Sequence, residues 1–236
     1  MIFWQLLLAH LIGDFPLQFN EIFRLKVKSK WGVLLHCAIV VMISALFLVP
    51  YVLTMQMWCG IIILICSHFI IDWTRVILSK KANLDNLWMF LLDQGLHILI
   101  VWLVSQIISY PPFIIPLILP ESIRDVLENK QIILTMCGFI AAGYFGAILI
   151  HYLKKMFING YTSQSLSTKR YGIVERLLIM VLILMPGLFF LFIPTILFAR
   201  MSISRVKEEE YSLFDSIVSM AFAVIFGLIL KVFVWL

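Results

Sequence analysis

Charged residues are scarce in this sequence of 236 residues. They make up 13% of it, and hydrophobic residues make up 63%. Soluble globular domains are about a quarter charged and about half apolar. The apolar residues also come in runs of roughly twenty, which is long enough to cross a hydrocarbon core of about 30 Å. The composition excludes an ordinary soluble domain and predicts an all-α polytopic integral membrane protein.

Other features are missing too. The opening MIFWQLLLAH has no basic stretch and no small-residue cleavage site, so we expect it to form a membrane helix and not a cleaved signal. There is no C-x-x-C pair: Cys37, Cys59, Cys66 and Cys137 are scattered in apolar runs, as buried structural cysteines are. The net charge of +5 comes from basic residues at the ends of apolar runs. That pattern follows the positive-inside rule and predicts no nucleic-acid partner.

The apolar runs predict about seven membrane spans. They lie near residues 2–18, 31–53, 57–78, 87–108, 132–153, 172–198 and 213–236. The basic loop EIFRLKVKSK after the first run places the N-terminus outside and the C-terminus inside. Pro186 and Pro194 interrupt the sixth run, so we expect that span to be kinked or re-entrant.

Proline also divides the chain into three parts. Residues 110–131 begin with YPPFIIPLILP, whose four prolines favour an outer interfacial or re-entrant segment over a span. Before it, residues 1–109 form a predicted four-helix part, and after it residues 132–236 form a three-helix part. The first four spans repeat a weak pattern of His and Asp, which suggests two parallel hairpin repeats.

Ionisable residues recur inside three of the early runs. His10 with Asp14, and His68 with Asp72, are spaced i and i+4, as are Asp93 and His97. That spacing puts each pair on one helix face. Counted from the inner ends of the runs at 1.5 Å per residue, the carboxylates fall roughly 6–9 Å deep and the histidines about 6 Å deeper. His36 joins the carboxylate level, so we expect the seven residues to share one site.

Imidazole and carboxylate together suit zinc, manganese or iron. We therefore predict one or two divalent ions, zinc first, held by residues that could reach the same point: His10, His68, His97, Asp14, Asp72 and Asp93. The three aspartates and His36 would act as catalytic groups, by bridging, orienting or accepting a proton. The same residues could instead form a path for protons or cations, and spacing alone does not choose between the two.

Several motifs carry a resemblance. They are H-x-x-G-D-F-x-x-Q at 10–18, L-L-H at 34–36, H-F-x-x-D at 68–72, L-x-D-Q-x-x-H at 91–97 and G-x-x-E-R-x-L-I at 172–179. With them the chain resembles an uncharacterised bacterial inner-membrane family, domain of unknown function 3307. The resemblance implies a multi-pass protein of the bacterial plasma membrane, and it carries no established activity.

A shorter motif points toward hydrolysis. SHFIIDWT, from Ser67 to Thr74, is similar to the S-H-x-x-x-D-x-x-T element of predicted metal-dependent inner-membrane hydrolases, with its threonine one residue early. We expect a hydrolase whose amphiphilic substrate is a lipid or lipid-linked phosphate near the cytoplasmic leaflet. The candidate substrate-binding residues are Gln18, Gln94, Glu175, Arg176 and Arg205. The alternatives are a proton- or cation-coupled transporter or channel, and a structural subunit of a membrane complex.

Overall fold

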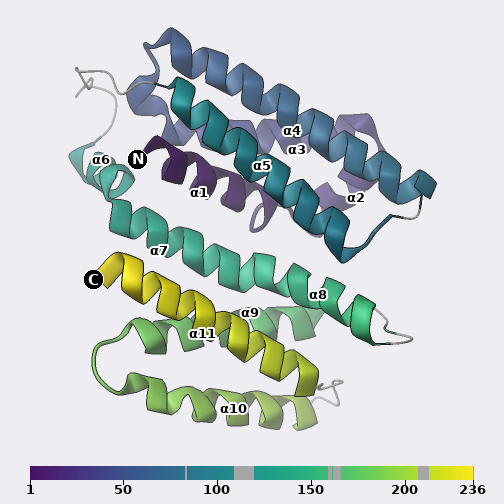
Figure 1. Ribbon diagram of the computed structural model, residues 1–236, viewed down its shortest axis with the longest axis vertical. Helices are drawn as coiled ribbons and strands as arrows, with labels where there is room; N and C mark the ends of the chain where they lie inside the picture. Colours follow the sequence, from purple (N-terminus) through teal and green to yellow (C-terminus); the bar gives the residue numbers. More distant parts are fainter. Residues whose placement is uncertain (83, 109–119, 159–160, 162–165, 207–212, 236) are drawn as a thin grey trace. The chain divides into compact units, whose positions relative to one another are not determined.

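The computed structural model describes residues 1–82, 84–108, 120–158, 161, 166–206 and 213–235, and these are helical with no β-strand among them (Figure 1). The helices are α1 (Ile2–Asp14), α2 (Asn20–Lys28), α3 (Lys30–Phe47), α4 (Met55–Ala82), α5 (Leu87–Ile107), α6 (Glu121–Glu128), α7 (Lys130–Ile140), α8 (Gly146–Phe157), α9 (Leu166–Leu184), α10 (Ile193–Val206) and α11 (Leu213–Trp235). Short 3-10 turns cover Val49–Tyr51 and Phe189–Phe192, and a π-helical segment, η2, covers Ala141–Phe145.

Five helical stretches of the described residues are long and apolar enough to cross a membrane. They are Lys30–Phe47, Met55–Ala82, Leu87–Ile107, Lys130–Phe157 and Phe214–Phe233. This is therefore a multi-pass membrane protein. The first expected span is shorter than predicted, because α1 ends at Asp14 after 13 residues. The proline-rich stretch expected at the interface lies largely outside the described residues, which resume at Pro120.

The sixth expected span differs most from the prediction. Instead of one kinked helix over 172–198, the structure has α9 and α10, which pack against each other as a helical hairpin (Figure 1). Pro186 cannot donate a backbone hydrogen bond, and Gly187 adopts a φ of 81° that only glycine takes readily. Together they end α9 and reverse the chain.

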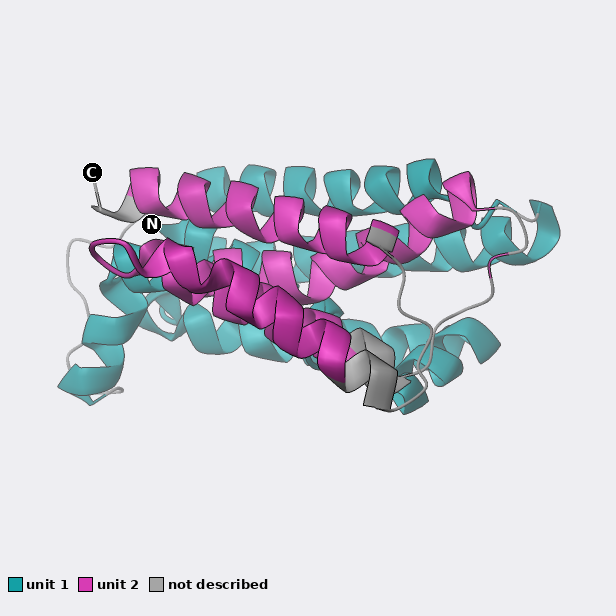
Figure 2. Cartoon of the chain, turned by 90° about the horizontal axis from the view of Figure 1, so that it is seen from below, with its two compact units in different colours: residues 1–133 teal, residues 134–236 magenta. Residues whose placement is uncertain are grey.

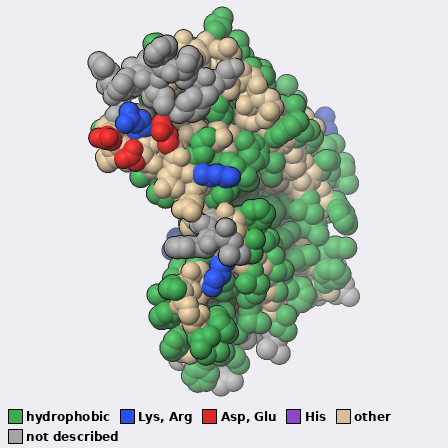
Figure 3. Space-filling model, turned by 60° about the vertical axis from the view of Figure 1, so that its left-hand side comes forward, with side chains coloured by type: hydrophobic (Ala, Val, Ile, Leu, Met, Phe, Trp, Pro, Cys, Tyr) green, Lys and Arg blue, Asp and Glu red, His purple; other side chains and the backbone are tan. Residues whose placement is uncertain are grey.

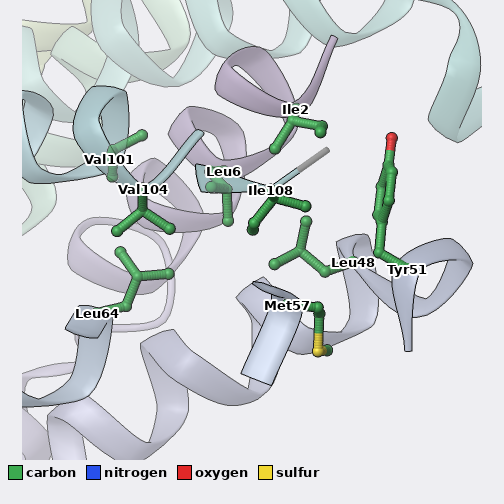
Figure 4. Close-up of a cluster of buried hydrophobic side chains, with 9 residues drawn as sticks. All are labelled: Ile2, Leu6, Leu48, Tyr51, Met57, Leu64, Val101, Val104 and Ile108. Atoms are coloured by element: carbon green, nitrogen blue, oxygen red, sulfur yellow. The ribbon is translucent and has the colours of Figure 1, made fainter. Parts of the chain in front are cut away.

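The chain forms two units, residues 1–133 and 134–236, which Figure 2 shows in separate colours. In the first unit, α1 packs against α3 and α5, and α4 packs against α3 and α5, so that the four helices enclose a common interior. Buried, largely hydrophobic side chains cluster at one end of this interior (Figure 4). They are Ile2, Leu6, Leu48, Tyr51, Met57, Leu64, Val101, Val104 and Ile108.

The short helix α2 joins α1 to α3 and packs closely on α3. Ser29 caps α3, because its Oγ accepts a hydrogen bond from the Gly32 N–H at 3.1 Å. Gly32 faces the backbone of Leu25 so closely that an added Cβ would overlap the Leu25 carbonyl group. This contact holds α2 against the start of α3.

In the second unit, α9 packs against α10 and α11, and α8 contacts α9 and α11. Its apolar core includes Ile179, Met180, Ile183 and Ala223, which are all at most 4% exposed. Large apolar side chains are also exposed in both units, for example Trp31 at 69% and Phe233 at 73%. On the face drawn in Figure 3, hydrophobic side chains predominate and charged ones are few. Such surfaces suit contact with lipid.

Candidate metal centre

Seven histidine and aspartate side chains meet in the interior of the first unit, next to the apolar end of the four helices. They are His10 and Asp14 from α1, His36 from α3, His68 and Asp72 from α4, and Asp93 and His97 from α5. Each is at most 5% exposed. The structure thus brings together the seven residues that the sequence placed at similar depths.

Four of their atoms form a compact group, which we call the four-atom group: His36 Nε2, His68 Nε2, Asp14 Oδ1 and Asp72 Oδ2. Five of the six separations among them lie between 3.2 and 3.6 Å. A regular tetrahedron with such edges has its centre about 2.0 Å from each corner, which is the length of Zn–N and Zn–O bonds. These buried groups could therefore hold a metal ion.

Lys26 brings a positive charge to this group. It lies on α2 and is 7% exposed, and its Nζ is 2.8 Å from Asp72 Oδ1. Burial lowers the pKa of Lys26, but the neighbouring carboxylates, Asp72 first and Asp14 next, raise it above the usual 10.5. The side chain is thus an ammonium ion at neutral pH and neutralises part of the carboxylate charge. The sequence does not reveal this role, because Lys26 belongs to a basic stretch that the positive-inside rule already explains.

Asp93 is arranged differently from the other two aspartates. Its Oδ2 accepts hydrogen bonds from Arg75 Nη1 at 2.8 Å and from Gln94 Nε2 at 2.9 Å, and its backbone carbonyl lies 2.8 Å from His97 Nδ1. It belongs to none of the groups of described residues that could hold an ion. In the structure, Asp93 orients its neighbours. The prediction that it binds metal directly gains no support from these contacts.

A second group of three residues, His10, Asp14 and His97, could also hold an ion. One ligand atom from each lies within 4.8 Å of the others. Cys37 completes a third group with His68 and Asp72. The spacing between the cysteines predicts a purely structural role for Cys37, and the signal for a ligand role is instead its position next to His36 on α3.

The predicted substrate-binding glutamines both contact the site. Gln94 Nε2 lies 3.5 Å from Asp14 Oδ2. With its amide oriented to satisfy both neighbours, Gln18 donates to the Asp14 carbonyl and accepts from Lys26 Nζ, each at 3.2 Å. The two amides therefore hold Asp14 and Lys26 in place. Whether either contacts a substrate stays a prediction.

The other three predicted substrate-binding residues lie in the second unit. Arg176 is 2% exposed and donates to the carbonyls of Ala142 and Gly143 in η2, each at 2.7 Å, and to Ser219 Oγ at 3.0 Å. Glu175 Oε2 lies 3.7 Å from Arg200 Nε. Arg205 belongs to α10, but its side chain lies outside the part that the structure describes. In the structure, the guanidinium of Arg176 satisfies backbone carbonyls, and its binding of a substrate anion stays a prediction.

Comparison with known proteins gives one match. No curated protein and no solved structure is significantly similar to this chain. The model of a protein family described only as a protein of unknown function (DUF3307) matches residues 2–118. The matched segment contains α1 to α5, and with them all seven histidines and aspartates, Lys26 and Arg75. The resemblance to this family is thereby confirmed for the N-terminal half, and the match does not extend to the motif at 172–179: residues 2–118 belong to the DUF3307 family.

Proposed function

We propose that this protein is a membrane-embedded metal-dependent hydrolase that acts on an amphiphilic substrate, a lipid or lipid-linked phosphate. The observation that carries the proposal is the four-atom group, whose five separations of 3.2–3.6 Å match the edges of a tetrahedral coordination sphere. Buried polar side chains that merely lie near one another would have more varied separations than these five. The proposal places the protein in a bacterial inner membrane with the site toward the cytoplasmic leaflet.

Zinc fits the four-atom group best. Two imidazole nitrogens and two carboxylate oxygens about 2.0 Å from a common centre match Zn²⁺, whereas Ca²⁺ takes six to eight oxygens at about 2.3–2.6 Å. Manganese and iron accept the same donors. The charges agree with one dication: Asp14, Asp72 and Asp93 carry three negative charges, and Lys26 and Arg75 carry two positive ones. With neutral histidines, the cluster has one net negative charge to be compensated.

A bound divalent ion would supply Lewis acidity, and by expanding to five ligands it would bind a water and lower the pKa of that water. The residues around it would do the remaining work. Lys26 and Gln18 keep Asp72 and Asp14 oriented, and Arg75 and Gln94 do the same for Asp93. The helices around the cluster are apolar, which favours a substrate with a lipid part. The basic side chains of Lys26 and Arg75 favour a substrate with an anionic head group.

A cation transporter is the second candidate, and one observation favours it. Asp14 belongs both to the four-atom group and to the second group, with His10 and His97. Two adjacent ion positions that share a carboxylate would let an ion step from one to the other. A hydrolase requires that the ion stay bound during turnover, whereas a transporter requires that it leave.

The first test is the metal content of the detergent-purified protein. We expect about one equivalent of a divalent transition metal, because the four-atom group supplies a complete set of donors for a tetrahedral ion. His68→Ala should lower the content at least tenfold, since it removes a donor and leaves a gap. His151→Ala is the matched control, because His151 belongs to the second unit and lies 3.1 Å from the Tyr161 hydroxyl. Metal-free protein, or equal metal in both variants, would contradict the proposal and leave a cluster held by hydrogen bonds alone.

A second test separates the two candidates. In liposomes that contain the purified protein, a hydrolase releases phosphate from a phosphatidic acid or a lipid-linked pyrophosphate, and no metal crosses the bilayer. A transporter moves zinc inward, as a fluorescent indicator in the lumen would report, and releases no phosphate. Asp72→Asn should abolish whichever signal is seen, because it removes a donor of the four-atom group. Zinc flux without phosphate release would contradict the proposed hydrolase activity and support the transporter.

A further inference from the structure

Two histidines of the cluster are left over when the four-atom group is complete. His10 and His97 are 2% and 3% exposed, and the Nε2 atom of each has no hydrogen-bond partner among the residues that the structure describes. Leaving a buried polar atom unsatisfied costs about 1–3 kcal/mol. Two neighbouring imidazole nitrogens without partners therefore indicate that a ligand from outside the chain binds to them.

The contacts of His97 fix the form of its ring. Its Nδ1 lies 2.8 Å from the Asp93 carbonyl, which can only accept a hydrogen bond. Nδ1 therefore carries the proton, and Nε2 presents a lone pair. A backbone carbonyl or carboxylate on the second nitrogen is the usual partner of a metal-binding histidine.

His10 is placed in a similar way. Its Nδ1 faces Asp14 Oδ1 at 3.8 Å, and its Nε2 is the atom without a partner in the described part of the chain. The rings of His10 and His97 stack with their centroids 5.0 Å apart and their planes 19° from parallel. The two rings thus lie side by side, and Asp14 completes the group of three.

Next to these rings is a small cavity of about 10 Å³. His10, His68 and His97 line it together with Ser44, Ser67 and apolar residues of α3, α4 and α5. A space of this size is close to the minimum that holds one water molecule. It therefore leaves room beside the second group for one oxygen atom that does not come from the protein.

We propose that His10, His97 and Asp14 form a second, weaker cation site that fills only together with a phosphate group. The inference rests on the proposed function, because it takes the first ion as bound. One dication changes the net charge of the cluster from −1 to +1, and a second alone would raise it to +3 in a buried, apolar interior. Such uncompensated charge is costly to bury. A phosphate monoester with two negative charges brings the total back to +1 and offers oxygens for the open coordination positions.

Equilibrium dialysis of the purified protein against zinc tests this inference. With zinc alone, we expect one bound ion per chain. With zinc and inorganic phosphate, or with zinc and micelles that contain phosphatidic acid, we expect two. Chloride, whose single negative charge cannot restore the charge balance, is the anion control and should leave one ion bound. The arm that recruits the second ion at the lower concentration identifies a free phosphate or a lipid head group as the source.

Variants assign the second ion to its ligands. His97→Ala and His10→Ala should each bind one ion under every condition, and the retained first ion shows that each variant is folded. His151→Ala should still bind two with phosphate. One ion in all arms of the unmodified protein, or a second ion that persists in His97→Ala, would refute the second site and leave the first intact. No bound ion in any arm would contradict the proposed function itself, and the inference with it.

Discussion

Lys26→Met should lower the free energy of unfolding of the metal-free protein by about 3–5 kcal/mol, the usual cost of breaking a buried ion pair from one side. Methionine has nearly the same length as lysine but cannot neutralise Asp72, which is fully buried 2.8 Å from Lys26 Nζ. Bound zinc should reduce the loss, because the ion takes over part of the compensation. Thermal unfolding of the detergent-purified protein, with and without zinc, measures both effects.

Lys28→Met is the matched control for this prediction, since Lys28 lies on the same helix but is exposed. It should change stability by no more than about 0.5 kcal/mol, as surface substitutions usually do. Combining Lys26→Met with Asp72→Asn should restore much of the stability in metal-free protein, because no unpaired charge is left. Equal losses in Lys26→Met and Lys28→Met would mean that the pair between Lys26 and Asp72 is not formed.

Gly32→Ala should be the most damaging single-methyl change in the first unit. The new Cβ would overlap the Leu25 carbonyl, and neither backbone can yield without moving α2 away from α3. Overpacking costs about 1–3 kcal/mol even where flexible side chains can adapt, and here the displaced helix carries Lys26. We therefore expect a loss of at least that size, together with weaker zinc binding in the dialysis experiment.

Gly95→Ala supplies the comparison. Gly95 also lies inside a helix of the first unit, beside Gln94 of the cluster, but nothing lies within 4 Å of an added Cβ. Alanine there should be neutral or should stabilise by up to about 1 kcal/mol, because it suits a helix interior better than glycine. If Gly32→Ala and Gly95→Ala behave alike, the close contact between α2 and α3 does not hold Lys26 in position.

The sequence predicted the cluster but not its internal arrangement. Spacing of i and i+4 places His10 over Asp14 and His68 over Asp72 in any helix. The similar depths of the pairs in the apolar runs then predict that the pairs from different helices meet. Which atoms come within 3.6 Å depends on how far each helix is rotated about its own axis. That rotation brings His36, predicted as an assisting residue, into the four-atom group, and it leaves His10 and His97 beside it.

Lys26 and the α9–α10 hairpin illustrate two further limits of the sequence pattern. A basic loop between two apolar runs is normally explained by the positive-inside rule, and nothing local distinguishes Lys26 from Arg24 or Lys28. Its helix contacts α3 at Gly32, a residue six positions later, where an added Cβ would overlap the backbone of Leu25. In the second unit, Pro186 alone is compatible with a kinked helix. The left-handed φ of Gly187 reverses the direction of the chain after α9, and the presence of a glycine does not by itself predict that angle.

The π-helical segment η2 has a consequence for insertions and deletions. A π turn accommodates one more residue than an α-helix would over the same length, and Arg176 donates to two of its carbonyls. Deleting one residue there would let the helix continue in regular α geometry and would keep the facing of α8, whereas deleting one residue from α8 before Lys154 would turn everything after it by about 100°. Lys154 on α8 would then face away from Asp215, its ion-pair partner at 2.8 Å. Within this span, a one-residue deletion is therefore tolerated better in η2 than in α8, and its cost is the change in the carbonyls that Arg176 binds.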